Sequence, residues 1–435
     1  MRLFISIGLC LALAGCASHP SSFPIVARTV SDRTGYALNT NADRSPQLDA
    51  AINDLLSKPL TADAAARLAL LNSPALAAHL DAVRVAEAQL VIASQIKNPS
   101  FDIAVRPPDK PPSGTDIEAS ASADILDVLL VPLRKKIAQN QLDQATLQAA
   151  DDALSLVHDV RVAVYVCSAS QLILQTQKQI TAAASAAADF ARRQHDAGNI
   201  DDLSWVGYQS AEAQSQLDLL RAESKLSADR ESLNRLLGLN PQQMQWTISP
   251  VLPPIPAQDS PQTTVNDRLD VQIASHQVAL AEQSLSLTRN GLLTEVRLGA
   301  SMERQSDSQT VAGPYLALDV PIFNQHQGEI AEAKAQALMA QSRLQELTIN
   351  AQSDLRLADE RLSAARSAAD LANGTLLPLR KQAVELTQQK FNGMLVGLYT
   401  LLSARQDELS ANRDAIETLR DYWIAKADLD RAVGH

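Results

Sequence analysis

The feature that most constrains this chain is an internal repeat, in which each of two copies is almost half as long as the chain. A helical pattern that begins at Asn72-Ser73-Pro74 returns about 195 residues later at Asp267-Arg268-Leu269. The same shift carries the turn at Asp196-Ala197-Gly198 onto Phe391-Asn392-Gly393. Two separate landmarks therefore agree on one offset, and this period is far longer than that of a solenoid repeat.

Both halves follow one predicted order: a helix, two strands, a very long helix, a turn and a further helix. The long helices are rich in Ala, Gln and Leu, which favour helix, and have almost no interior Gly or Pro. At 1.5 Å per residue, a run of about 65 residues is roughly 100 Å long. The predicted elements span residues 62–96, 100–106, 116–125, 131–195 and 203–238, and then 265–290, 293–304, 314–322, 326–390 and 396–432.

The N-terminus has the pattern of a secreted lipoprotein. Leu3 to Leu13 is apolar but too short to span a bilayer, and Leu13-Ala14-Gly15-Cys16 is typical of a lipobox. We expect residues 1–15 to be removed as a signal peptide and Cys16 to become the acylated N-terminus. An ordinary signal peptide with an incidental Cys16 is the alternative. Ala17, rather than Asp, resembles the outer-membrane sorting signal of such lipoproteins.

These features predict a mostly α chain with a small β part. The short helices of each half together match its long helix, and so could stack beside it as an antiparallel coiled coil. The predicted divisions are a signal peptide at 1–15, a lipidated irregular segment at 16–61, a first repeat at 62–238, a Pro-rich linker at 239–264 and a second repeat at 265–435.

Charge and composition narrow the partners. The formal net charge of −11 argues against nucleic acid as a partner. Beyond the leader, only Cys16 and Cys167 remain, so no intrachain disulfide is expected if Cys16 is acylated. No stretch after the leader approaches the roughly 20 apolar residues of a transmembrane helix, so a membrane crossing would have to use β-strands.

The predicted strands alternate between apolar and polar residues. Period two with charges on one face fits a wall with lipid outside and water inside. A periplasmic sheet with one wet face is the simpler alternative. Four strands cannot close a membrane barrel, because the smallest have about 8, and open edges are not tolerated in lipid. The barrel would therefore be shared between chains in a symmetric ring.

The repeat order, together with three local motifs, resembles the TolC family of outer-membrane efflux proteins. The motifs are Leu71-Asn72-Ser73-Pro74-Ala75-Leu76, Val131-Pro132-Leu133 and Leu318-Asp319-Val320-Pro321-Ile322-Phe323. The resemblance implies a homotrimer, with four strands from each chain in a twelve-stranded barrel continued by an α-helical channel-tunnel. It also implies a periplasmic adaptor, or membrane fusion protein, that meets the helical tips and connects them to an inner-membrane pump.

The candidate functional residues lie at the tips of the two helical hairpins. Gly198, Asn199, Gly393 and Met394 would contact the adaptor, although the two glycines could equally serve only to end their helices. Family members often carry acidic gate residues after the second tip, where this chain has Thr400 and Ser403. Asp201 and Asp202 near the first tip are the remaining acidic candidates for a periplasmic gate, and a solvated helix start is an equal interpretation.

Two other classes of function fit less well. The sequence has no phosphate-binding Gly-rich loop, no GxSxG, no HExxH and no CxxC, so we expect neither an enzyme nor a cofactor or metal site. A lipid-anchored periplasmic coiled-coil scaffold or adaptor would explain the helices but not two strand pairs at matching positions. The ending at 419–429 resembles branches associated with metal or copper resistance, and the cargo stays open.

The lipobox gives a first testable prediction. Cys16→Ser should abolish incorporation of labelled palmitate, because that thiol is the expected acylation site. Cys167→Ser is the matched control and should keep the label, since Cys167 lies within a predicted long helix. A labelled Cys16→Ser chain would contradict the lipobox assignment.

Overall fold

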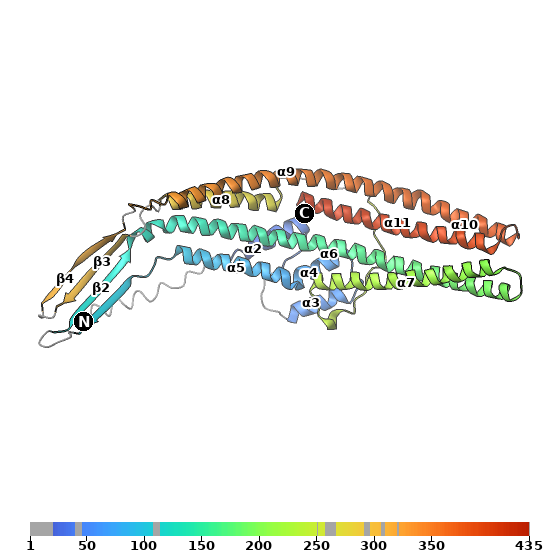
Figure 1. Cartoon of the computed structure of the whole chain (residues 1–435), viewed down its shortest axis with the longest axis horizontal. Coiled ribbons are helices and arrows are strands. Elements are labelled where there is room, and N and C mark those ends of the chain that lie inside the picture. Colours follow the sequence, from blue (N-terminus) through green and yellow to red (C-terminus); the bar gives the residue numbers. More distant parts are fainter. Residues whose placement is uncertain are drawn as a thin grey trace. The chain divides into compact units, whose positions relative to one another are not determined.

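The computed structural model describes residues 21–39, 46–107, 114–249, 251–256, 267–290, 296–305, 309–319 and 322–434. The predicted signal peptide and Cys16 lie outside these ranges. The first half contains α4 (Ala62–Asn72), α5 (Pro74–Ser94), β1 (Ser100–Arg106), β2 (Asp116–Asp124), α6 (Ile125–Asp196) and α7 (Asp202–Leu237). The second contains α8 (Leu269–Asn290), β3 (Val296–Arg304), β4 (Thr310–Leu318), α9 (Gln327–Leu371), a π-helical turn η3 (Ala372–Leu376), α10 (Leu377–Asn392) and α11 (Leu398–Val433). Figure 1 shows this succession twice along the chain.

The predicted order of elements is confirmed, with local differences. The helix predicted over 326–390 is interrupted by the π-helical turn η3, which separates α9 from α10. The first helix is divided at Ser73, whose extended backbone (φ −70°, ψ 118°) is what a following proline requires. Helix α6 begins at Ile125 rather than 131, and Pro132 lies inside it. Strand β4 begins at Thr310, four residues earlier than predicted, and Gln305 N, directly after β3, donates to Gln309 O (2.9 Å), directly before β4.

The segment 16–61 was predicted to be irregular, and this prediction is wrong for two of its parts. It contains α2 (Phe23–Thr34) and α3 (Pro46–Leu56). Val26, Val30 and Ile52 are fully buried. Short helices of this kind owe their stability to the packing of one apolar face rather than to intrinsic propensity, which is why sequence patterning overlooked them.

The chain forms two compact units. The first combines Met1–Val26, His79–Ala149 and Leu269–Thr348. It contains all four strands, the adjoining parts of α5, α6 and α9, and α8. Asn140 on α6 donates to Gln283 on α8 (2.6 Å), and Gln341 on α9 donates to Glu282 on α8 (3.1 Å). Helix α8 therefore lies beside both long helices within this unit.

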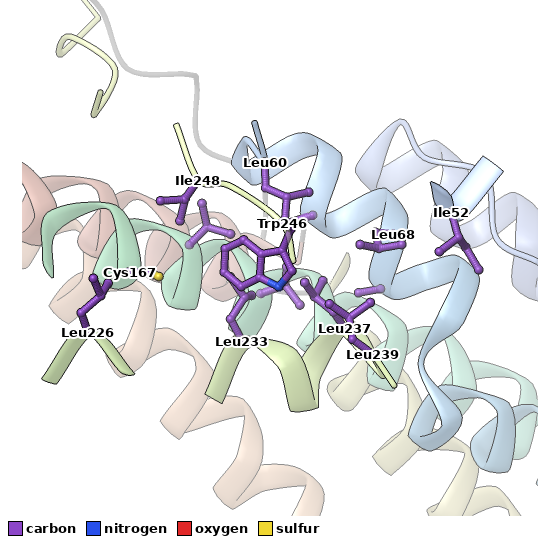
Figure 2. Packing of buried hydrophobic residues seen from close by; sticks show 14 of the residues in the cluster. Ile52, Leu60, Leu68, Cys167, Leu226, Leu233, Leu237, Leu239, Trp246 and Ile248 are labelled. Atoms are coloured by element: carbon purple, nitrogen blue, oxygen red, sulfur yellow. The ribbon is translucent and has the colours of Figure 1, made fainter. Parts of the chain in front are cut away.

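The second unit combines Ala27–Ala78, Ala150–Arg268 and Ile349–His435. Its main core surrounds Trp246, which lies after α7 (Figure 2). The indole Nε1 donates to Asn234 Oδ1 (2.8 Å), so the one polar atom of this buried ring is satisfied. The backbones of Leu60 and Ile248 form an isolated parallel β-bridge next to the indole ring. Leu233 and Leu237 belong to the same buried cluster as the ring. This core fastens the start of the Pro-rich segment to α4, α6 and α7.

Paired antiparallel helices make up the rest of this unit. Gln177 and Thr181 on α6 both donate to the Ser215 carbonyl of α7, at 3.2 and 3.0 Å. On the other pair, Asn373 of the π-helical turn donates to Ala415 O on α11 (3.3 Å), and Arg380 pairs with Asp407 (3.0 Å). A second core on α9 and α11 surrounds the fully buried Tyr422. Alanine occupies many of the buried positions, which permits the close helix approach predicted from the sequence.

The offset between the two repeats is 196 residues over these helices, one more than the sequence landmarks indicated. Helices α7 and α11 both have 36 residues and begin at Asp202 and Leu398. Both end in a left-handed glycine, Gly238 (φ +64°) and Gly434 (φ +94°). The sequence landmarks missed one residue because the glycines that they aligned, Gly198 and Gly393, do not occupy equivalent positions in the two turns.

By length and composition alone, helix α6 is long and apolar enough to cross a membrane. An 18-residue window in it has a mean hydropathy of 1.2, and 44% of that window is buried inside the structure. The helix is therefore more apolar than the sequence analysis expected. A helix packed in a protein core meets the same criteria, and α6 contributes Val160, Val164 and Cys167 to the core around Trp246.

Gly238 should be irreplaceable by any residue with a side chain. A Cβ there would lie 2.6 Å from Asn72 O and from Pro74 Cδ, in a left-handed backbone conformation. Gly238→Ala should therefore destabilise the fold by about 2–4 kcal/mol through backbone strain and overpacking. Gly207→Ala is the matched control, since its Cβ would meet nothing within 4 Å and removing a helix-interior glycine gains up to about 1 kcal/mol. Thermal unfolding followed by circular dichroism should separate the two variants, and equal midpoints would contradict this account.

Candidate functional site

The four strands form one antiparallel sheet in the order β1-β2-β3-β4. Opposite residues share a face, so the pairs Ile103↔Ala119, Ala119↔Met302 and Met302↔Ala312 carry one face across all four strands. The two hairpins of the two repeats thus join edge to edge. Their separate alternations, predicted from the sequence, combine into one continuous pattern.

One face of this sheet is almost entirely apolar. Apart from Arg304 and Thr310 at the end of the β3–β4 hairpin, only apolar side chains occupy it. Phe101 and Ile103 are 75% and 74% exposed, which a sheet that faced only water would not favour. The face consists of Phe101, Ile103, Val105, Ile117, Ala119, Ala121, Ala123, Val296, Leu298, Ala300, Met302, Ala312, Pro314, Leu316 and Leu318.

The opposite face is polar, and carboxylates predominate on it. Its charged residues are Asp102, Asp116, Glu118, Asp124 and Glu303, against Arg106 and Arg297. Arg106 pairs with Glu118 (3.2 Å). A Cβ at Gly299 would lie 2.6 Å from the Tyr315 ring, so the absence of a side chain at Gly299 makes room for the tyrosine. Such a face is suited to line water.

The outer strands leave the sheet open. Within the described residues, β1 pairs only with β2, and β4 pairs only with β3. Each outer strand therefore presents a row of backbone N–H and C=O groups without a strand partner.

An ion-pair cluster marks the junction between β2 and α6. Asp127, in the first turn of α6, has a side chain only 4% exposed. It contacts Arg134 (3.0 Å) and the Lys97 ammonium (3.3 Å), and it also accepts from the Lys97 backbone N–H (3.2 Å). The cluster joins the loop before β1 to the start of the long helix.

The first helical tip is a compact turn between α6 and α7. Gly198 adopts φ +73°, and Asn199 N donates to Gln194 O (2.8 Å) to close the end of α6. Asp201 caps α7 by accepting from Ser204 N (3.0 Å). Asp202 accepts from His195 Nε2 at 2.8 Å if that nitrogen carries the proton, and the His195 ring stacks on Trp205.

The second tip repeats this turn with different residues. Met394, not Gly393, occupies the left-handed position (φ +58°), and Leu395 N donates to Lys390 O (2.9 Å). Gly397 begins α11 without a side-chain cap. The left-handed region is unfavourable for a residue with a side chain, and backbone hydrogen bonds of the turn, including Met394 N to Phe391 O (2.9 Å), hold Met394 in it.

Both tips expose apolar side chains. Met394 is 94% exposed, and Leu203, Leu395 and Tyr399 are also largely exposed. Behind the tips, Tyr208 on α7 meets Tyr399 on α11 edge to face, with ring centroids 6.2 Å apart. A cavity of about 150 Å³ lies there between α6, α7 and α11. The tips therefore present exposed apolar side chains, and the contact between Tyr208 and Tyr399 joins α7 to α11 directly behind them.

The predicted site residues fall into these two turns. Gly198, Asn199, Asp201 and Asp202 lie together in the first, and Gly393 and Met394 in the second. Thr400 and Ser403 are both exposed in the first two turns of α11, and Ser403 lines the cavity behind Tyr399. Sequence reasoning did not single out Leu203, Leu395 and Tyr399 as contact residues. Leu203 and Tyr399 lie in the first turns of α7 and α11, where apolar residues in place of the usual polar ones were the available signal. No cluster of three or more His, Cys, Asp or Glu that could hold a metal was found among the described residues.

Long antiparallel helix pairs joined to a small sheet with one apolar face and open edges fit a channel-forming protein of the bacterial outer membrane. The comparisons with solved structures support this fold. The chain resembles the outer-membrane channel CmeC of Campylobacter jejuni with a TM-score of 0.75 at 15% identity, over 89% of this chain and 86% of that one. It resembles the open state of the outer-membrane channel MtrE of Neisseria gonorrhoeae with a TM-score of 0.66 at 15% identity, over 89% of each chain.

The chain belongs to the outer membrane efflux protein family, whose model matches it twice, at residues 65–239 and 261–435. The two matches coincide with the two repeats. A curated relative, the cobalt-zinc-cadmium resistance protein CzcC of Cupriavidus metallidurans, is 24% identical over 387 residues, which cover 86% of this chain and 90% of the relative. The function predicted from the sequence, an outer-membrane channel for efflux, is thereby confirmed.

The cap at Asp201 yields a prediction about pH. The hydrogen bonds that Ser204 donates to the Asp201 carboxylate lower its pKa. This pKa is depressed in the folded state. The cap therefore stabilises the fold fully above pH about 3.9, the ordinary aspartate pKa. This stabilisation is lost only as the pH falls through the lower pKa of the folded state. Hydrogen exchange of the Ser204 amide should therefore stay slow down to that pH. Asp201→Ala should speed this exchange at neutral pH, whereas Asp202→Ala, which leaves the cap intact, should not. Equal exchange in both variants would contradict the assignment.

Proposed function

We propose that this chain forms a homotrimer whose twelve strands, four from each chain, close a barrel in the outer membrane. The observation that carries the proposal is the open sheet with a continuous apolar face. In lipid, the unpaired groups along β1 and β4 would each cost several kcal/mol. Pairing β4 of one chain with β1 of the next satisfies them, and a ring of three gives a strand number typical of such barrels.

The helices would continue this barrel as a tunnel into the periplasm, and the complete protein would be the passive exit duct of a three-part export system. An inner-membrane pump would supply the driving force, and a periplasmic adaptor would meet the tips. The exposed Met394, Leu395 and Leu203 support this contact, because apolar groups in such positions mark binding surfaces. Gly198 and Gly393 would let the adaptor approach the backbone closely, and Asn199 would contact it beside them.

A gate at the tips would open when the adaptor binds. Asp201 and Asp202 would supply its acidic groups, while Thr400 and Ser403 would narrow the second turn without charge. Cys16 would carry acyl chains that hold the N-terminus in the outer membrane.

Metal cations are the cargo that we propose. The relative CzcC carries cobalt, zinc and cadmium resistance in its name, and its similarity extends over most of both chains. The excess of carboxylates on the polar face of the sheet favours cations over anions in a water-filled lumen. A duct requires passage rather than tight binding, so the proposal needs no metal site in this chain.

The orientation of the barrel wall can be tested on one strand. Leu298→Arg places a charge on the apolar face of β3, which costs about 2–4 kcal/mol near the centre of a bilayer. Ser301→Arg places the same charge on the polar face and should be tolerated. Light scattering of protein purified from outer-membrane fractions should give the mass of three chains for wild type and Ser301→Arg, with little trimer for Leu298→Arg. A soluble monomer once the lipid is removed would favour the alternative, a lipid-anchored periplasmic scaffold or adaptor.

The cargo has its own test. A strain that lacks this chain should become more sensitive to Co²⁺, Zn²⁺ and Cd²⁺ while its antibiotic resistance stays unchanged. Wild-type protein should restore growth, and the Leu298→Arg chain should not, since no closed duct would form. Sensitivity to antibiotics alone would overturn the choice of metal cations and leave the duct intact.

A further inference from the structure

The first turns of α6, directly after β2, have an unusual exposed face. Ile125, Val128 and Leu129 are exposed, Leu129 by 70%. Pro132 is exposed on the same side, and Lys135 and Lys136 follow it. At 100° per residue, these side chains fall within an arc of about 120°. One helix face therefore changes from apolar to basic with distance from the sheet.

The two lysines differ from the other cations at this junction. Arg134 and Lys97 are paired with the buried Asp127, and Lys97 also lies 3.8 Å from Asp124. Asp127 and Arg134 lie on the other side of α6, about 140–160° from the centre of the exposed face. Lys135 and Lys136 are exposed, and neither has an ion pair among the described residues. Their charge is available to a partner outside the chain.

The dimensions of the sheet place this face at a membrane boundary. Strands of seven to nine residues, tilted as in membrane barrels, cover about 18–23 Å of bilayer thickness. The apolar band of outer-membrane barrels is about 25 Å tall. Ile125, Val128 and Leu129 supply the missing few ångströms, and the lysines lie about 10 Å beyond Leu129 along the helix axis. The headgroup layer is about 5–8 Å deep, and long lysine side chains can reach back to it.

We propose that Lys135 and Lys136 bind the phosphate groups of anionic phospholipids in the inner leaflet of the outer membrane. The occupant is a lipid because the basic pair follows exposed apolar side chains along one face of α6, and because long lysine side chains reach the headgroup layer while their stems cover apolar surface. The inference rests on the proposed crossing of the membrane by the strands.

The second repeat provides an internal contrast. The start of α9, which follows β4, has two exposed carboxylates, Glu329 and Glu332, against a single lysine, Lys334. Anionic lipid is therefore expected at the first-repeat junction of each chain and not at the second. In a trimer the two kinds of junction would alternate around the barrel.

The test compares lipid selectivity in variants of the full chain. Wild type, the double variant Lys135→Gln/Lys136→Gln and the control Lys381→Gln/Lys390→Gln on α10 are reconstituted in phosphatidylcholine vesicles. Electron spin resonance then measures how strongly spin-labelled phosphatidylglycerol associates with the protein relative to spin-labelled phosphatidylcholine. Wild type and control should prefer phosphatidylglycerol about fivefold, and the junction variant should show a ratio near 1. Added salt should weaken the preference in the first two.

Several outcomes would overturn the proposal. An unchanged ratio in the junction variant, or an equal loss in the α10 control, would show that these lysines do not select lipid. Inorganic phosphate should reduce the preference no more than chloride at equal ionic strength, and a larger effect would indicate a site for the free anion. Trimer mass is measured on the same samples. If wild type forms trimers but shows no lipid selectivity, only this inference is contradicted. If wild type is a monomer, the proposed function is contradicted. If only the junction variant is a monomer, the lysines lie at the subunit interface and the lipid proposal is overturned.

Discussion

The constraint on which the rest of the structure depends is the hydrogen bonding of backbone groups in lipid. Within the described residues, the sheet has two outer strands with one strand partner each and one face of almost unbroken apolar side chains. Such a sheet is unstable alone in a bilayer, since unpaired N–H and C=O groups find no water there. In water it would expose its apolar face instead. Closure with other copies would remove both costs at once, so the homotrimer that we propose rests on the strands rather than on the helices.

The helices differ from the sheet, because paired helices bury their apolar seams against each other within one chain and need no lipid to do so. The pairs are held by alanine-rich contacts, by side chains such as Thr181 that donate to a neighbouring helix, and by the cores around Trp246 and Tyr422. The Asp127 cluster fixes the start of α6 where the chain changes from strand to helix. Rigid helices can therefore begin at the membrane boundary without a flexible linker after β2.

Much of this could be predicted from the sequence, because the deciding signals are periodic and long. The helices of the repeats, the strand alternation and the position of both tips follow from patterning. The short helices α2 and α3 could not be predicted, since their stability comes from burial of Val26, Val30 and Ile52 against distant residues. The left-handed position of Met394 was also missed, because glycine is the usual residue there and Gly393 stands one position away. The roles of Asp201 and His195 depend on short-range geometry that patterning does not encode.

That geometry changes how the acidic residues of the first tip are understood. Asp201 caps α7, and Asp202 contacts His195, so each carboxylate has a structural partner within its own turn. Gly397 takes the equivalent place at the start of α11 and offers no side chain, and Thr400 and Ser403 follow it. A ring of acidic groups at the entrance would therefore come from the first repeat only. Ser204 holds the Asp201 carboxylate at the start of α7 and thereby lowers its pKa. Asp202 is held by its side-chain contact with His195, so Asp202 would be the more mobile acid in the proposed gate.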